Sequence, residues 1–188
     1  MIEDSYIIDK FLNGDKDIFK DIITKYNKSL INFIRFYTGL KDECEDILQE
    51  VFIETYKSIK NFNRNSSFKT WLYGITINIC RTYRRNHQKN LKFISNNSEN
   101  SKNETLNSIP DFTYNPERIY TLKEEKEILF NILETLPEKY KSLIFLRDTE
   151  CFSYKEISNL LNIPVGTVRS RIHNATVLIL EKYQYYLK

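Results

Sequence analysis

Glycine and proline are scarce in this chain, at 4 residues each among 188. Loop-rich β-sandwiches, collagen repeats and glycine-built nucleotide sites all use more of them, so the composition argues against these structures. The three cysteines, Cys44, Cys80 and Cys151, are far apart and odd in number, and no Cys-x-x-Cys spacing occurs. We therefore expect neither a zinc site nor a disulfide framework, and scattered thiols favour a reducing compartment.

Apolar runs of the length that a membrane span needs are also missing from the sequence. The first residues, Met1-Ile2-Glu3-Asp4, are acidic where a signal peptide carries lysine or arginine. Both absences predict a cytoplasmic protein with no membrane contact of its own. The length allows one or two domains, and 41% hydrophobic residues suffice for a folded core.

Enzyme signatures are missing as well, because no Gly-x-Ser-x-Gly, Walker-type loop or His-Glu-x-x-His occurs. The two histidines, His87 and His173, stand among basic residues without an evident carboxylate partner. Cys80 lies within two helical turns of His87, but such a lone pair on one helix is more often structural than catalytic. We expect no enzymatic activity, no metal and no cofactor.

The residues that are present favour helices. Four N-terminal segments have a helical pattern, namely 5–12, 15–37, 42–59 and 68–83. Gly39 is placed to end the second helix, and Asp42 with Glu45 resembles a capping box at the start of the third. No strand-like alternation of any length occurs, so the predicted fold class is all-α.

The middle of the chain has a different composition, since serine and asparagine dominate from Ser95 to Ser108. We predict two small helical domains, 1–87 and 117–188, joined by a flexible linker over 88–116. The scattered apolar residues of this linker, such as Phe93 and Leu106, suggest that parts of it dock onto a partner.

The C-terminal domain has the pattern of a helix-turn-helix. Pro137 is placed as the first residue of one helix, and Ser153 to Glu156 matches a capping box that opens a helix through Leu161. A last helix begins at Val165 after a short interruption. The same cues also fit an ordinary helical hairpin.

Charge is distributed unevenly, although the formal net charge is only +3. Residues 42–54 are rich in acids, which alone suits a solvated helix face with carboxylates near its N-terminus. No acid follows Glu54 until Glu99, whereas nine lysines and arginines lie in that stretch. Positive charge without interruption is typical of a surface that a polyanion neutralises.

The fourth predicted helix concentrates this signal. Its basic, hydrogen-bonding face comprises Asn78, Arg81, Thr82 and Arg85, spaced by three or four residues. Phe62, Phe68, Trp71 and Tyr73 lie nearby, and aromatic rings beside a cationic groove suit the stacking of unpaired bases. Core packing is the competing interpretation, stronger for Phe68 and Trp71 than for Phe62 and Tyr73.

The last predicted helix carries a second DNA-binding pattern. Its exposed face comprises Arg169, Ser170, His173 and Asn174, with Arg171 to one side. Arginine and asparagine pair with guanine and adenine edges in a major groove, and Lys155 is placed to touch phosphate. The N–H groups near Thr167 favour a phosphate as well. A solvated helix remains the alternative, although acids are absent from Ile157 to Leu180.

Taken in order, five segments resemble the bacterial RNA polymerase sigma factors of the extracytoplasmic function (ECF) class. They are Asp46-Ile47-Leu48-Gln49-Glu50-Val51-Phe52, Phe68-Lys69-Thr70-Trp71-Leu72-Tyr73, Leu136-Pro137-Glu138-Lys139-Tyr140, Tyr154-Lys155-Glu156-Ile157 and Ile163-Pro164-Val165-Gly166-Thr167-Val168-Arg169-Ser170-Arg171. The resemblance covers both domains and omits the linker. It implies a transcription initiation factor that binds core RNA polymerase and promoter DNA, and it allows an anti-sigma factor as a partner.

The resemblance also implies a role for each block of residues. It assigns contact with the β′ clamp helices to Asp46, Gln49, Glu50 and Phe52. It assigns recognition of the −10 element, including an unpaired base, to Phe62, Asn63, Arg64, Trp71, Asn78, Arg81, Thr82 and Arg85. It assigns recognition of the −35 element to Lys155, Thr167, Arg169, Ser170, Arg171, His173 and Asn174, and the same domain is expected to contact the β flap.

Two departures from the family pattern stand out. Gly74 lies inside a helix where the family often has a basic residue, and close approach of another backbone is one explanation. Asn174-Ala175-Thr176 replaces the arginines that family members commonly carry, which predicts a weaker or altered −35 contact. The alternative functions are an ordinary helix-turn-helix regulator and a competitor that binds polymerase without promoter activity.

Overall fold

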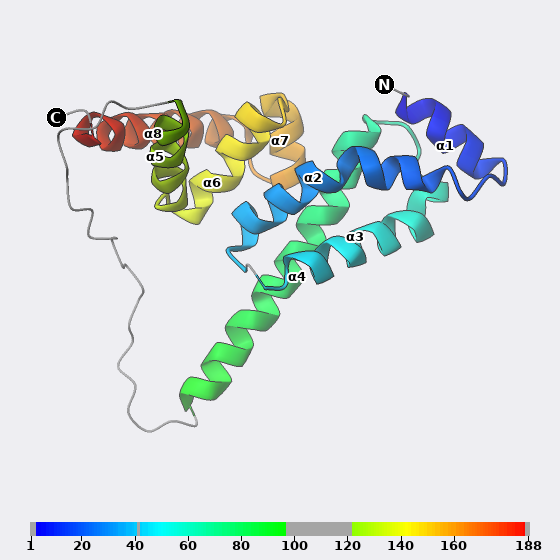
Figure 1. Ribbon diagram of the computed structural model, residues 1–188, viewed down its shortest axis with the longest axis horizontal. Helices are drawn as coiled ribbons and strands as arrows, with labels where there is room; N and C mark the ends of the chain where they lie inside the picture. Colours follow the sequence, from blue (N-terminus) through cyan, green and yellow to red (C-terminus); the bar gives the residue numbers. More distant parts are fainter. Residues whose placement is uncertain (1–2, 41, 97–121, 187–188) are drawn as a thin grey trace.

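The computed structural model describes residues 3–40, 42–96 and 122–186, and of residues 90–96, 122–127 and 138 the backbone alone. Figure 1 shows an assembly of helices, and no strand occurs in these three ranges, so the all-α prediction is confirmed. The elements are α1 Asp4–Leu12, α2 Phe19–Thr38, α3 Cys44–Ser58, η1 Ile59–Asn61, α4 Phe68–Asn96, α5 Leu122–Glu134, α6 Glu138–Ile144, η2 Phe145–Thr149, α7 Tyr154–Leu161 and α8 Val165–Tyr186.

The N-terminal helices α1 to α4 pack around a core that is formed by the apolar face of each helix. Helix α2 lies against α1, α3 and α4, and Phe33, Ile34 and Leu30 on it are fully buried. On α3 and η1, the face that the helical pattern predicts to be apolar is buried at Leu48, Val51, Phe52, Thr55 and Ile59. Gly39 caps α2 with φ 71°, a left-handed conformation that glycine adopts without steric cost.

Some predicted boundaries were wrong. Helix α3 begins at Cys44, and no side chain caps it, so Asp42 forms no capping box. Helix α4 is capped instead by Ser67, whose Oγ accepts from the Thr70 N–H at 3.0 Å. Helix α4 also continues to Asn96, into the stretch predicted as linker. The rest of that stretch, 97–116, lies outside the described residues.

The C-terminal helices form the predicted helix-turn-helix. Ser153 and Glu156 make a complete capping box, in which the Glu156 carboxylate accepts from the Ser153 N–H at 2.9 Å. Helix α7 ends at Asn162 in a left-handed conformation, with φ 55°, and α8 begins at Val165. Pro137 precedes α6 as its N-cap residue rather than opening the helix.

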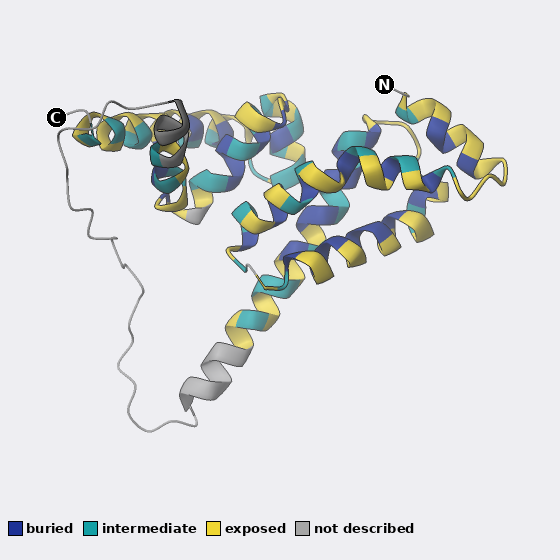
Figure 2. Ribbon diagram, viewed as in Figure 1, coloured by how far each residue is buried: buried dark blue, intermediate teal, exposed yellow. Residues whose placement is uncertain are grey.

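The two halves of the chain pack against each other. Helix α2 meets α6, α4 meets α7, and one buried cluster runs through both halves, as the dark blue segments of Figure 2 indicate. Ring centroids of Phe33 and Phe145 are 5.5 Å apart, and those of Tyr73 and Phe152 are 5.1 Å apart. This packing was not expected from the sequence.

Candidate polymerase and nucleic-acid interface

The outer face of α3 presents the acidic residues that the sequence analysis selected. Asp46, Gln49 and Glu50 are exposed there. Glu50 also faces α4, because its hydrogen-bonding carboxylate raises the pKa of Tyr83. Phe52 is only 8% exposed and belongs to the core. The prediction that Phe52 offers a contact surface therefore needs correction, since its ring supports the acidic face from inside.

The polar face of α4 is solvent-accessible from Asn78 to Arg85. Asn78, Arg81, Thr82 and Arg85 are all exposed, and the Thr82 hydroxyl donates to the Asn78 carbonyl at 3.2 Å. The Arg81 guanidinium donates to the Leu161 carbonyl, at the end of α7, at 3.1 Å. One member of this face is thus engaged by the C-terminal half of the chain.

Residues 62–67, which we call the 62–67 loop, join η1 to α4 and carry Phe62, Asn63 and Arg64. Asn63 and Arg64 are exposed, and Phe62 is half-buried. The Phe62 ring lies 5.3 Å from Trp71 and 5.7 Å from Phe68, measured between centroids. Phe68 is buried and Trp71 half-buried, so these rings form an apolar base beneath the loop.

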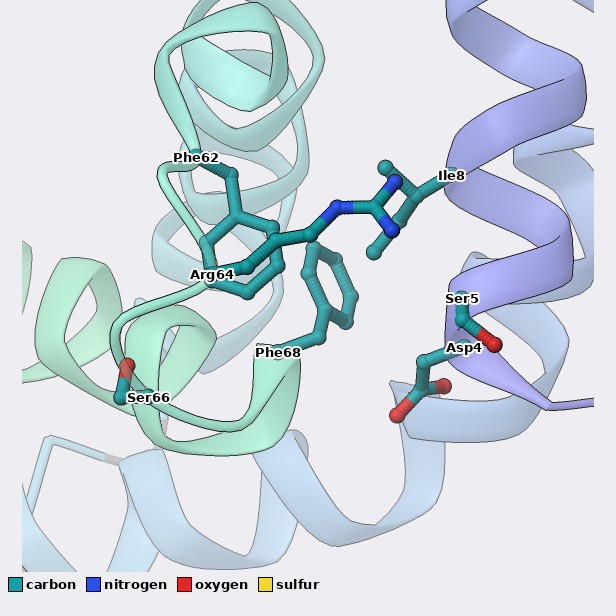
Figure 3. A pocket seen from close by; sticks show the side chains of 7 residues that line it. All are labelled: Asp4, Ser5, Ile8, Phe62, Arg64, Ser66 and Phe68. Carbon is teal, nitrogen blue, oxygen red and sulfur yellow. The ribbon is translucent and has the colours of Figure 1, made fainter.

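A cavity of about 190 Å³ opens between the 62–67 loop and α1. Figure 3 shows the Arg64 side chain extending across it toward Ile8 of α1, with Phe68 below. Its lining combines two aromatic rings with hydroxyl, carboxylate and guanidinium groups. The residues are Asp4, Ser5, Ile8, Phe62, Arg64, Ser66 and Phe68.

Helix α1 was given no functional residue by the sequence analysis, yet it forms one wall of this cavity. The Asp4 carboxylate accepts from Lys25 Nζ and from the Tyr26 hydroxyl, each at 2.7 Å. Asp9 pairs with Arg64 of the loop. These contacts join residues 21 to 55 positions apart, and no local sequence pattern indicates them.

Two interpretations of α4 residues were wrong. Tyr73 is fully buried, packed against Phe33 and Phe152, so its ring is core and offers no stacking surface. Its hydroxyl has no hydrogen-bond partner among the described residues. No backbone atom from another segment of the described chain lies within 4 Å of a Cβ built at Gly74. A Cβ there would meet only the Leu160 side chain at 3.8 Å, which is ordinary contact.

The helix-turn-helix presents the predicted −35 residues on one surface. Lys155, Arg169, Ser170, His173 and Asn174 are exposed, and Thr167 and Arg171 are half-buried. Val168, Ile172 and Ala175 form the buried stripe of α8 that turns this face outward. The Ser170 hydroxyl donates to the Thr167 carbonyl at 3.2 Å.

Polar contacts between the halves surround the start of α4. Lys69 Nζ lies 2.9 Å from the Glu150 carboxylate, whose side chain is only 6% exposed, and donates to the Glu150 carbonyl at 2.8 Å. The Thr70 hydroxyl donates to Glu156 at 3.0 Å. Hydrogen bonds from Ser153, supported by Thr70 and by the charge of Lys69, hold the pKa of Glu156 below its usual value.

Comparisons with known proteins identify two family segments in the chain. Residues 22–90 match the family model of Sigma-70 region 2, and residues 126–177 match that of Sigma-70 region 4. Helix α1 lies before both matches. Among the described residues, no helix is long and apolar enough to cross a membrane.

Curated relatives match over nearly the whole chain. The ECF RNA polymerase sigma-E factor of Haemophilus influenzae is 31% identical over 183 residues, which cover 97% of this chain and 96% of that protein. The sigma-E factor of Escherichia coli K12 is 31% identical over 188 residues, with 97% and 95% covered.

Solved structures share the fold at lower identity. The sigma factor RpoE from Bartonella quintana, in complex with the anti-sigma factor NepR, has a TM-score of 0.67 at 19% identity, covering 88% of this chain and 96% of that one. CnrH, in complex with the cytosolic domain of CnrY, has a TM-score of 0.62 at 16% identity, covering 97% of both chains. With its acidic α3, acid-free α4 and helix-turn-helix in the family's order, the chain belongs to the ECF class of RNA polymerase sigma factors.

Proposed function

We propose that three surfaces divide the work by which this sigma factor directs transcription initiation. The acidic face of α3, with Asp46, Gln49 and Glu50, binds the β′ clamp helices of core RNA polymerase. Charge complementarity at such a face speeds association and fixes its register. The buried Phe52 ring holds this face in place. An ordinary helix-turn-helix regulator would not need an acidic face for polymerase binding.

The second surface, which contacts the −10 element, is the 62–67 loop together with the polar face of α4. In this proposal the cavity beside Phe62 receives an unpaired non-template base. The cavity beside an acid-free helix is the single observation that most favours this role. Rings below the loop give a base its stacking partner, and Asn78, Thr82 and Arg85 hold the adjacent strand.

The third surface is the outer face of α8, which enters the major groove of the −35 element. Arg169, Ser170, His173 and Asn174 lie over base edges or flanking phosphates, and Lys155 of α7 contacts phosphate. The same domain contacts the β flap, and the stretch between the domains threads through the polymerase. We assign the domains as 1–96, which includes the whole of α4, and 117–188.

The chain performs no bond chemistry in this scheme and needs no metal or cofactor. The free energy gained by binding the extruded base and the adjacent strand opens the promoter. We place this activity in the cytoplasm, where the polymerase works. Since one structural relative, the sigma factor RpoE from Bartonella quintana, is in complex with an anti-sigma factor, a protein of that class is a fitting regulatory partner for this chain as well.

Promoter binding requires the two halves of the chain to separate. The −10 and −35 elements are 25 base pairs apart, which is about 85 Å of B-form DNA. Arg81 touches Leu161, and the eight residues from Leu161 to Arg169 span at most about 30 Å. We therefore infer that the packed arrangement of the two halves is a resting state. Binding to polymerase and promoter stabilises the separated arrangement.

The experiment for the second surface is promoter opening by the complete holoenzyme. Asn78→Ala removes a hydrogen-bonding side chain from the exposed face of α4 without disturbing the core. It should leave core polymerase binding intact and reduce the permanganate reactivity of −10 thymines. Asn159→Ala, an exposed change on α7, serves as the control. Undiminished reactivity in Asn78→Ala would move the melting function away from this face.

A further inference from the structure

Helix α1 is fixed at both ends on the rest of the N-terminal half. Near its start, the Asp4 carboxylate accepts from Lys25 Nζ and from the Tyr26 hydroxyl of α2, each at 2.7 Å. At its end, Phe11 is buried, and its carbonyl accepts from Lys16 Nζ at 2.9 Å. Because the helix between these attachments is continuous, the side chains on its outer face start from a fixed backbone.

Asp9 lies on that outer face and pairs with Arg64 of the 62–67 loop. The loop also has local hydrogen bonds, such as the one from the Asn65 N–H to the Asn63 side-chain oxygen at 3.1 Å. A local bond supports the curvature of the loop but does not tie it to another element. The Asp9 pair does so, because it joins positions 55 apart in the sequence. The orientation of the loop relative to α1 therefore depends on this pair.

The backbone of Arg64 has an unusual conformation. Its φ is 60°, in the left-handed region that an arginine rarely adopts. Such a conformation costs free energy and persists where the surrounding contacts determine it, which is common at ligand sites. Figure 3 shows that the Arg64 side chain extends from the loop across the cavity toward Ile8 of α1. The unusual backbone thus places a cation over the cavity.

The guanidinium and two aromatic rings line the same cavity. Phe62 and Phe68 supply flat apolar surfaces, and Arg64 supplies a planar cation that stacks on the face of a base. This stacking requires the guanidinium to stay over the cavity, whereas a free arginine side chain samples many rotamers. An acidic partner that fixes the guanidinium removes this freedom before the ligand arrives, which favours binding.

We propose that Asp9 is a positioning residue for promoter opening, because its carboxylate holds the Arg64 guanidinium over the cavity and prepares the 62–67 loop for the unpaired base. This inference rests on the proposed role of the cavity, and it holds whichever base occupies it. It extends the −10 surface to α1, which lies before the segment that matches the family model of Sigma-70 region 2. Asp9 itself contacts no DNA in this scheme.

The test measures the affinity of the complete holoenzyme for a promoter that is pre-melted across the −10 element. Asp9→Asn keeps the size of the side chain and should weaken binding about threefold, within the range for exposed ion pairs. This direction is informative, because the loss of a negative charge by itself favours DNA binding. Asp15→Asn, the matched control, removes the same charge from an exposed position and should bind at least as tightly as wild type. Asp9→Glu keeps the charge and should retain most of the affinity.

Two further measurements separate positioning from a general structural role. Arg64→Gly removes the partner, and glycine adopts the left-handed backbone freely, so adding Asp9→Asn to that variant should cause no further loss. Salt screens an exposed pair, and the two side chains are 50% and 55% exposed. The affinity ratio between wild type and Asp9→Asn should therefore approach one as salt is raised. Wild-type affinity of Asp9→Asn, an equal defect in the Arg64→Gly background, or a defect independent of salt would overturn the positioning role.

Phe62→Ala distinguishes this inference from the proposed function. If the cavity holds a base, loss of this ring weakens binding of the same pre-melted promoter. Weaker binding by Phe62→Ala together with wild-type affinity of Asp9→Asn rejects Asp9 as a positioning residue and leaves the cavity as the base site. Wild-type affinity of Phe62→Ala rejects the base site, and the positioning role with it, whatever the result for Asp9→Asn.

Discussion

In the proposed scheme, exposed side chains bind the partners, and buried neighbours hold these side chains in position. Asp46 and Glu50 are exposed one turn apart on α3, above the buried Val51 and Phe52. Arg169 and Ser170 stand above the buried Val168 in the same way. A change at an exposed position should therefore affect binding and leave the free energy of unfolding nearly unchanged.

Charge reversal on α3 tests polymerase binding. The double variant Asp46→Lys and Glu50→Lys should weaken core polymerase binding by about tenfold or more, because several interactions are lost and two are turned repulsive. Pull-down with purified core polymerase measures this. The double variant Asp15→Lys and Asp17→Lys changes the net charge equally at exposed positions before α2 and should bind normally. Equal retention of both variants would contradict the role of α3.

Arg169 and Arg171 differ in exposure, which predicts different contributions to −35 binding. Arg169 is exposed, so Arg169→Ala should cost about 1–3 kcal/mol at one promoter position if the side chain contacts a base. If Arg169 contacts a phosphate instead, the substitution should weaken binding to all sequences alike and lower the salt dependence of log K by about one unit of slope. Half-buried Arg171 should have the smaller effect. Binding to a randomised −35 element at two salt concentrations distinguishes the outcomes, and no change for either would remove α8 from recognition.

Individual helices were the most predictable level of this structure. Local patterns were enough for the Gly39 cap, the Ser153 capping box and the start of α8, because each depends on residues a few positions apart. Asp42 failed as a cap since the start of α3 is set by packing of Cys44 and Ile47 into the core. The cavity beside α1 and the burial of Tyr73 depend on distant contacts, which periodicity does not encode.

The capping box of α7 gives a pH-dependent prediction. Ser153→Ala should lower the free energy of unfolding by about 1 kcal/mol in urea denaturation. The pKa of Glu156 is lowered in the folded state, so its ionised carboxylate stabilises the fold fully at pH values above the unfolded-state pKa near 4.5. This stabilisation is lost as the pH falls through the folded-state pKa. The stability difference between wild type and Glu156→Gln should therefore shrink in acid. A constant difference from pH 7 to pH 3 would contradict this account.

At the scale of the whole molecule, the packing between the halves is the feature on which the proposed resting state depends. Apolar contacts of Phe145 and Phe152 combine there with the ion pair of Glu150, whose side chain is 6% exposed, and Lys69, whose side chain is 33% exposed. Replacing the Glu150 carboxylate breaks this ion pair and leaves the Lys69 charge without its partner. The resting arrangement should therefore be sensitive to a single uncharged substitution.

Glu150→Gln supplies that substitution with little change in size. The free variant should have a larger radius of gyration in small-angle X-ray scattering than the wild type, and its holoenzyme should bind promoter DNA more readily. Asp148→Asn removes the same charge two residues away from an exposed side chain and should behave as wild type. A Glu150→Gln chain as compact as the wild type would show that this pair does not hold the halves together.

Run-off transcription with purified core polymerase on a genomic promoter library tests the central claim most directly. The account predicts transcripts that depend on this chain, start at defined sites and share upstream sequences at the −35 and −10 positions. The Asp46→Lys and Glu50→Lys double variant should yield none of them. Binding of the chain alone to discrete DNA sites, with no chain-dependent transcripts from core polymerase, would contradict the assignment as a sigma factor.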